Sequence, residues 1–267
     1  MLRRLVVLAA LVLPSSALAA YPTPYAQQGN PGVLSTDGAV RFVAYDAPGA
    51  ATTLAAVNAS DGSRLRSSTL PGSFGVPMLT YNGVAGGLSH DGKTLILQSV
   101  GLPPKTQFTI VGTDDLAARD TITLNGLFGY DALSPDAKTL YLIQRKSSTD
   151  YDHYVVRAYD LTSHTLLRRR IADRTQKTWV MQGRATARAT TADGRWVYTL
   201  YQNPGGYPFV HALDTVKGIA HCIGLPWPAT DVNQLALNNM RLSIKGRLLK
   251  VGDYATIERT TWKVKKL

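Results

Sequence analysis

The stretch that decides the fold is LSHDGKTLIL, residues 88–97, which returns as LSPDAKTLYL at residues 133–142. Seven of the ten positions are identical, and the two stretches begin 45 residues apart. Each contains a Ser-x-Asp-Gly element, with Ala137 in place of glycine in the second stretch, and continues into an apolar run. Asp in this element can accept a hydrogen bond from the backbone ahead of it, and Gly adopts a positive φ without strain. The element therefore predicts a tight turn that leads into a strand.

The turn occurs five times along the chain. Its third position is held by Asp37, Asp91, Asp136, Asp193 and, in a degenerate fifth copy, Lys245. These positions are 54, 45, 57 and 52 residues apart. Repeats of roughly 40–50 residues built from short strands are typical of propeller blades. The sequence therefore predicts a single β-propeller with five blades.

Each repeat divides into four short runs that alternate apolar and polar residues or are apolar throughout. In the third repeat we expect strands over residues 129–134, 140–144, 154–159 and 165–171. In the second repeat we expect the innermost strand over residues 84–89. No segment shows the 3.6-residue apolar period of a helix. The predicted fold is all-β, with four-stranded blades and the first strand of each repeat nearest the axis.

A Ser-x-Asp-Gly turn followed by a Leu-Tyr-Leu-like strand resembles the secreted bacterial propeller proteins of the YVTN type. The resemblance extends over residues 33–267. It implies a fold and a loop-bearing rim that binds ligands, but no one activity, since such propellers serve many roles. Members of that family usually have seven blades, whereas five repeats fit this chain.

The first residues have the pattern of a secretory signal. Arg3 and Arg4 precede an apolar run, and Ala17-Leu18-Ala19 has the small-x-small form of a cleavage site. We therefore expect a signal peptide over residues 1–19, a lead-in over 20–32 and the propeller over 33–267. The chain is expected to be secreted, or retained in the periplasm or cell envelope. No later apolar run is long enough to span a membrane.

Composition narrows the possible partners and the chemistry. The 267 residues carry a formal net charge of +11, which suggests anionic surroundings such as cell-wall polymer, polysaccharide or lipid headgroups. No nucleic-acid partner is expected. The single cysteine, Cys222, excludes an internal disulfide framework. Of the 18 acidic residues only Glu258 is a glutamate. Lactonase-type propellers use an acidic metal site that contains Glu, and five-bladed glycosidases use a pair of carboxylates, one of which is usually Glu. With Glu258 alone, neither pattern can be carried over to this chain.

The alternating strand directions of a propeller sort the aspartates between two rims. Ten lie near turns between first and second or third and fourth strands, where they are explained as turn-forming residues. The rim opposite carries the loops between second and third strands and the connections between blades. Seven aspartates map to this opposite rim: Asp46, Asp131, Asp150, Asp152, Asp173, Asp231 and Asp253.

The densest acidic cluster on that rim is RKSSTDYDHY, residues 145–154. Asp150, Asp152 and His153 offer two carboxylates and an imidazole, which are ligands for a divalent cation. A solvated polar loop is the alternative explanation. The sequence therefore leaves two hypotheses open, a divalent cation bound by these three residues and no cofactor at all.

A ligand site on the same rim is predicted from residues that flank the axial channel. It consists of Asp131, Tyr130, Trp179, Arg184 and Asp231. The aromatic residues either stack on a ligand or cap the core of a blade. The acidic and basic residues, which include Arg188, either bind a ligand or form a structural ion pair.

The sequence offers little for nucleophilic catalysis. His221 and Cys222 are adjacent, so on a strand their side chains point to opposite faces. The basic run LLRRRIADRTQK, residues 166–177, falls on and after an outer strand. Charged outer strands prevent edge-to-edge pairing, and binding of an anionic polymer is the other interpretation.

Two functions follow from these patterns. The first is a secreted, non-catalytic propeller that binds a protein or an envelope polymer through its loop-bearing rim. The alternative is a propeller hydrolase, similar to lactonases or glycosidases, with an Asp-based metal site.

Overall fold

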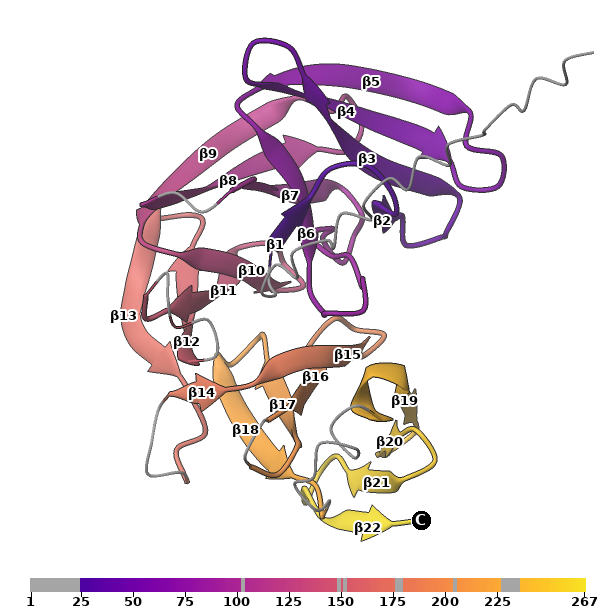
Figure 1. Ribbon diagram of the computed structural model, residues 1–267, viewed down its shortest axis with the longest axis vertical. Coiled ribbons are helices and arrows are strands. Elements are labelled where there is room, and N and C mark those ends of the chain that lie inside the picture. Colours follow the sequence, from indigo (N-terminus) through magenta and orange to yellow (C-terminus); the bar gives the residue numbers. More distant parts are fainter. Residues whose placement is uncertain are drawn as a thin grey trace, which may run out of the picture.

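The computed structural model shows five four-stranded antiparallel sheets arranged side by side around a common axis (Figure 1). The structure describes residues 25–101, 104–147, 150, 153–175, 180–203, 206–226 and 236–267. Within this part of the chain the helical structure is one short 3-10 turn, η1 (Leu237–Asn239). The molecule is an all-β propeller with five blades, as predicted. No helix within the described residues is long and apolar enough to cross a membrane.

The strands of each blade follow one another from the axis outward. Blade 1 contains β2 (Val33–Leu34), β3 (Val40–Ala47), β4 (Ala51–Asn58) and β5 (Arg64–Pro71). Blade 2 contains β6 (Phe74–Met78), β7 (Thr94–Ser99), β8 (Lys105–Gly112) and β9 (Ala118–Asn125). Blade 3 contains β10 (Phe128–Leu133), β11 (Thr139–Arg145), β12 (His153–Asp160) and β13 (Thr165–Ile171), with β14 (Met181–Gln182) beside β12.

The last two blades follow the same plan. Blade 4 contains β15 (Arg184–Thr190), β16 (Trp196–Gln202), β17 (Phe209–Asp214) and β18 (Ile219–Gly224). Blade 5 contains β19 (Leu242–Lys245), β20 (Leu248–Val251), β21 (Ala255–Glu258) and β22 (Val264–Lys266). The strands of blade 3 begin and end within one residue of the predicted bounds.

The inner strand of blade 2 corrects one prediction. It is β6, ten residues before the predicted segment 84–89, in which only Ala85 and Leu88 form isolated bridges. Between β6 and its turn the chain makes an extra hairpin, which accounts for the longer spacing of the first two turns. The lead-in also contributes a strand: β1 (Tyr25–Gln27) pairs antiparallel with β6 on its axial side.

The Ser-x-Asp turns have the predicted hydrogen bonds. In blade 2, the Ser89 hydroxyl donates to Asp91 Oδ1 over 2.7 Å, and the Lys93 amide donates to the same oxygen over 3.1 Å. The Thr94 amide donates to Ser89 Oγ over 2.9 Å. These bonds to the carboxylate lower the pKa of Asp91. The same arrangement recurs at Asp37, Asp136 and Asp193. We call the edge formed by these turns the turn rim, and the opposite edge the loop rim.

Four hydrophobic clusters hold successive blades together. They join blades 1 and 2, 2 and 3, 3 and 4, and 4 and 5. Within the described residues no such cluster joins blade 5 to blade 1. On blade 5 a cross-strand row of polar residues faces away from blade 4: Ser243, Lys250, Thr256 and Lys265. The ring is therefore packed as a row of five blades whose two end blades are not sealed by a shared apolar core (Figure 1).

Candidate functional site

One position of the repeat lines the channel cavity in blades 2, 3 and 4. It lies five residues before the turn residue, and in successive blades it holds Gly32, Gly86, Asp131, Arg188 and Met240. Blades 3 and 4 thus present opposite charges at equivalent places. In blade 3 a β-bulge leaves Asp131 without a partner, since Tyr130 pairs with Leu142 and Ala132 with Tyr141. Such a bulge bends a strand and redirects the side chain at that place.

Asp131 and Arg188 form a buried ion pair. Arg188 Nη1 lies 2.9 Å from Asp131 Oδ1, and the two side chains are 7% and 5% exposed. Arg188 Nη2 also donates to the carbonyl oxygen of Asp131, and Nη1 reaches Thr199 Oγ1 at 3.1 Å. The guanidinium group therefore donates hydrogen bonds to both the side chain and the backbone of Asp131. This many charge-assisted hydrogen bonds offset the cost of removing two charges from water.

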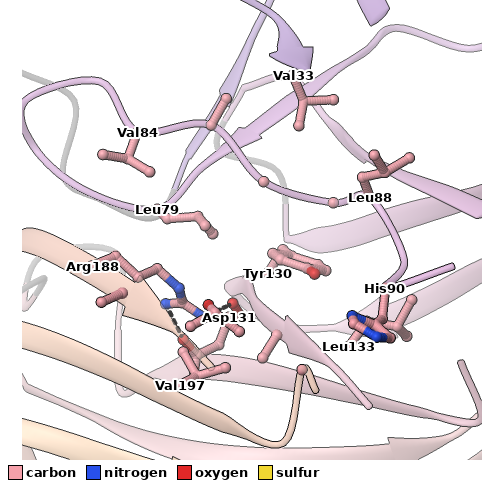
Figure 2. Close-up of a pocket in the computed structure, with 17 residues that line it drawn as sticks. Val33, Leu79, Val84, Leu88, His90, Tyr130, Asp131, Leu133, Arg188 and Val197 are labelled. Atoms are coloured by element: carbon pink, nitrogen blue, oxygen red, sulfur yellow. Dashed lines mark hydrogen bonds and ion pairs between the residues drawn. The ribbon is translucent and has the colours of Figure 1, made fainter. Parts of the chain in front are cut away.

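A cavity of ≈ 290 Å³ lies directly beside this pair (Figure 2). Its walls are mainly apolar and come from blades 1 to 4, and they include Val33, Leu79, Val84, Leu88, Leu133 and Val197. Its polar groups are the ion pair, Tyr130, Thr190 and His90. An apolar pocket with a few convergent polar groups is the usual form of a ligand site. His90 and Gly194 belong to the turns, so the cavity reaches the turn rim, and Leu79 and Val84 line it as well.

A polar row continues from Arg188 outward across blade 4. The register places Arg188, Thr199, His211 and Cys222 opposite one another on β15 to β18. His211 is 2% exposed, and burial lowers its pKa to about 4, so the imidazole is neutral. Its Nδ1 lies 3.6 Å from Cys222 Sγ. Burial, together with the charge of Asp173, raises the pKa of the Cys222 thiol to about 12.

This His–Cys contact does not have the properties of a catalytic dyad. The nucleophile in such a dyad is a thiolate, and it requires a lowered thiol pKa. Cys222 instead keeps its proton, and its backbone amide donates to Asp173 Oδ2 over 2.8 Å. The cysteine contacts His211 of the neighbouring strand, while its chain neighbour His221 stacks on Trp196 and Trp262. We therefore assign this row a structural role.

The extra hairpin of blade 2 crosses the channel at the loop rim. We call residues 79–84 the channel hairpin. The Leu79 amide donates to the Val84 carbonyl, and the Val84 amide donates to Thr80 Oγ1. At its tip the Tyr81 amide donates to the carbonyl of Ala185 in blade 4 over 2.7 Å. Asn82 Nδ2 lies 3.3 Å from the carbonyl oxygen of Asn238, just before blade 5. The hairpin thus links blade 2 to the far side of the ring.

The residues of the predicted ligand site lie in different environments. Asp131 and Tyr130 are 4% exposed and line the channel cavity. Arg184 is exposed at the start of β15, on the loop rim. Trp179 and Asp231 lie outside the described residues. Within the described set, only Asp131 and Tyr130 come together, and both are inside the molecule.

The predicted cation site is only partly described. Asp150 and His153 are about two-fifths exposed, and His153 Nδ1 lies 2.8 Å from Asp150 Oδ1. Asp152 falls outside the described residues. Over the part of the chain with a described structure, no group of three His, Cys, Asp or Glu side chains is placed to hold a metal ion. The cation site stays a prediction.

The sequence interpretation left open whether Arg188 binds a ligand or forms an ion pair, and the structure shows the ion pair with Asp131. The hairpin residues were not part of the predicted ligand site. Counting five positions back from each turn would have paired Arg188 with Asp131. The hairpin has a weaker signal in the sequence. The first and second turns are nine residues further apart than the second and third turns. Nothing local to the hairpin indicates that it crosses the channel.

Comparison with known proteins supports the fold. No family model matches the chain, and no curated protein matches it. A protein of unknown function from Desulfotomaculum acetoxidans is 13% identical, with a TM-score of 0.51 over 88% of this chain and 67% of that one. TolB from Acinetobacter baumannii is 13% identical, with a TM-score of 0.46 over 86% of this chain and 52% of that one.

A third similar structure is the β-propeller domain of Swd1 from Myceliophteria thermophila. It is 12% identical, with a TM-score of 0.49 over 87% of this chain and 68% of that one. The chain thus spans about half the length of TolB. At such low identity these likenesses concern the fold alone. The order of the strands in the five sheets shows that the described chain is a five-bladed β-propeller.

Proposed function

We propose that this protein is an exported, non-catalytic propeller that binds a protein, or an envelope polymer, on its loop rim. One observation supports this most directly. Among the described residues, three tyrosines belong to the large exposed apolar side chains: Tyr45, Tyr81 and Tyr207 are 39%, 41% and 62% exposed, and all lie at the loop rim. Tyr45 lies near the end of β3, Tyr81 at the tip of the channel hairpin and Tyr207 in the β16–β17 loop.

Exposed tyrosines favour a protein partner over a partner whose surface is purely polar. Tyrosine offers a large apolar surface and a hydroxyl with little loss of side-chain freedom, and it is enriched in interface centres. Val100, 39% exposed in the β7–β8 loop, adds aliphatic surface to the same rim. A rim that combines these residues with loops of several blades provides a broad binding surface on a rigid scaffold.

A photo-crosslinking experiment tests this proposal. A photoreactive phenylalanine analogue replaces Tyr81, Tyr207 or, as the control, Val216, which is 63% exposed at the turn rim. The proposal predicts the same adduct from Tyr81 and Tyr207 in the envelope fraction and no such adduct from Val216. Tyr81→Ser with Tyr207→Ser should weaken the purified complex at least about tenfold. Equal adducts from both rims would contradict the proposal.

The alternative function is a hydrolase with an Asp-based metal site. It is motivated by the 2.8 Å contact between Asp150 and His153 in the predicted cation loop. A cation bound only by the folded state would raise the melting temperature. Calcium titration of the wild type, and of Asp150→Asn with Asp152→Asn, tests this alternative. A melting temperature that does not respond to calcium or other divalent ions would remove it.

A further inference from the structure

The outer edge of blade 3 carries a cluster of arginines that have no acidic partner among the described residues. The outermost strand β13 has three consecutive exposed arginines, Arg168, Arg169 and Arg170, and Arg157 lies on the neighbouring strand β12. β13 lies at the outside of the molecule, far from the channel (Figure 1). We call these four residues the arginine edge.

The backbone of β13 is bulged at this cluster. Tyr159 pairs with Leu166 and Arg157 pairs with Arg170, so β13 has two more residues than β12 between these pairs. Arg157 fills the bulge, because its Nε and Nη2 donate to the Leu167 carbonyl at 3.3 and 2.7 Å. Its Nη1 donates to Gln144 Oε1 at 2.8 Å. The bulge thus holds Arg157 in a fixed position beside the three strand arginines.

Two like charges face each other directly across these strands. Arg157 is half-buried and its cross-strand partner is Arg170, an arrangement that by itself destabilises a sheet. Burial and the charge of Arg170 lower the pKa of Arg157. An anion placed between the two guanidinium groups would remove this repulsion. Guanidinium also suits such a role, since its planar donors match the oxygens of phosphate and carboxylate.

Three other arginines of the described chain, in contrast, form ion pairs with aspartates. Arg119 pairs with Asp115, Arg195 with Asp214, and Arg188 with Asp131. Over the described residues, no ion pair within 4 Å joins the arginine edge to an acid. The nearest acid along β12, Asp160, instead accepts hydrogen bonds from the Thr162 and Ser163 amides of the turn. The positive charge of the edge is therefore available to an external partner.

We infer that the arginine edge binds a linear polymer with repeated anionic groups, phosphate or carboxylate, which lies along β13. The row of three exposed arginines fits a repeating charge better than a single ion. Single-stranded nucleic acid is less well matched, because it requires aromatic side chains on which bases stack. The exposed apolar residue of β13 is the aliphatic Leu167, 40% exposed. This site is separate from the proposed loop-rim function.

The test measures binding of the purified full-length protein to inorganic polyphosphate and to polygalacturonate as a function of salt. Arg168→Ser with Arg170→Ser should weaken binding about thirty-fold. It should also reduce the slope of log affinity against log salt by about 2. The matched control is Arg64→Ser with Arg66→Ser, which removes two exposed arginines from the outer strand β5 and should change affinity less than about twofold. Circular dichroism and melting temperature confirm that both variants are folded.

The outcomes separate the possible ligands. The inference is supported if the protein binds polyphosphate alone or polygalacturonate alone and only the β13 variant loses this binding. The polymer that binds then identifies the anionic group. Equal losses in the two variants would show general attraction to a basic protein and overturn it. Absence of binding to both polymers would overturn it as well. Tighter binding of oligothymidylate than of polyphosphate at equal phosphate concentration would assign the edge to nucleic acid instead.

Discussion

At the residue scale, the channel depends on two opposite charges at equivalent positions of neighbouring blades. Asp131 and Arg188 are 57 residues apart in the chain and almost fully buried. A buried ion pair adds little stability over a well-packed apolar pair, yet removal of one partner leaves an uncompensated charge. The pair therefore makes the contact between blades 3 and 4 specific, and the channel sensitive to single substitutions.

Asp131→Asn should lower the free energy of unfolding by about 3–5 kcal/mol, because Arg188 stays buried without a counter-charge. Asp131→Leu combined with Arg188→Met should cost much less, since no charge remains in the channel. Urea denaturation of the three proteins measures the difference. A single variant that loses less than about 1 kcal/mol would show that water or another group solvates Arg188.

His211 gives a pH dependence with a defined sign. Its pKa in the folded protein is about 4 because it is buried, whereas an unfolded histidine titrates near pH ~6.5. As the pH falls from about 6.5 to about 4, the unfolded chain therefore binds a proton that the folded chain does not. Stability should fall by about 3 kcal/mol over this window.

The pH dependence is measured by urea denaturation between pH ~6.5 and ~4. His211→Gln should flatten the curve in that window, and His164→Gln serves as the control, because the His164 side chain is 60% exposed. If the stability of the His211→Gln variant falls with pH as steeply as that of the wild type, His211 is not the cause of the pH dependence.

At the element scale, the channel hairpin joins two blades that are not neighbours in the ring. The inner strands contact their neighbours around the ring, while residues 79–84 reach from blade 2 to blade 4 across the axis. Thr80 is fully buried and holds the hairpin in shape. Its hydroxyl donates to Asn82 Oδ1 over 2.6 Å and accepts the Val84 amide over 3.0 Å.

Thr80→Val keeps the shape of this side chain and removes both hydrogen bonds. The Val84 amide then loses its partner in a part-buried hydrogen bond, so the free energy of unfolding should fall by about 1–2 kcal/mol. Thr53→Val on β4, a partly buried threonine, is the control and should change stability by less than about 0.5 kcal/mol. Chemical denaturation compares the two. Equal effects would mean that the hairpin is held by side-chain packing alone.

At the scale of the whole molecule, the blades form a row with two distinguishable ends. Blade 3 packs on both faces, through the clusters that it shares with blades 2 and 4. Blade 5 shares one cluster, with blade 4, and its other face carries the polar row of Ser243, Lys250, Thr256 and Lys265. Stability in repeat folds is the sum of such neighbour contacts, so it should fall toward the ends.

Hydrogen exchange should reveal this gradient. We expect the amides of β20 in blade 5 to exchange faster than those of β11 in blade 3, although both are second strands. Mass spectrometry of peptides from each strand at neutral pH measures the two rates. Equal protection of the two strands would mean that the ring unfolds as one unit and that the contact between blades 5 and 1 is as strong as the others.

The sequence by itself determined the repeat and the elements within it. Ser89 and Asp91 form their turn through hydrogen bonds that span five residues, so the pattern is legible wherever it occurs. The alternation of apolar and polar residues makes the strands recognisable in the same way. The polar face that blade 5 turns away from blade 4 is also visible in the sequence, as Ser243, Lys250 and Thr256. These features were predictable because each depends on residues close together in the chain.

Only the tertiary structure decided which residues meet across the channel. The pairing of Asp131 with Arg188 and the bond from Tyr81 to Ala185 join segments from different blades. The repeat places Asp131 and Arg188 at equivalent positions, but a charge at such a position is equally compatible with solvent. Nothing local indicates that Tyr81 reaches blade 4. Likewise, the bulge that brings Arg157 and Arg170 together follows from strand register. The ring geometry, which sets these distances, is the physical reason that the candidate sites could not be derived from the sequence alone.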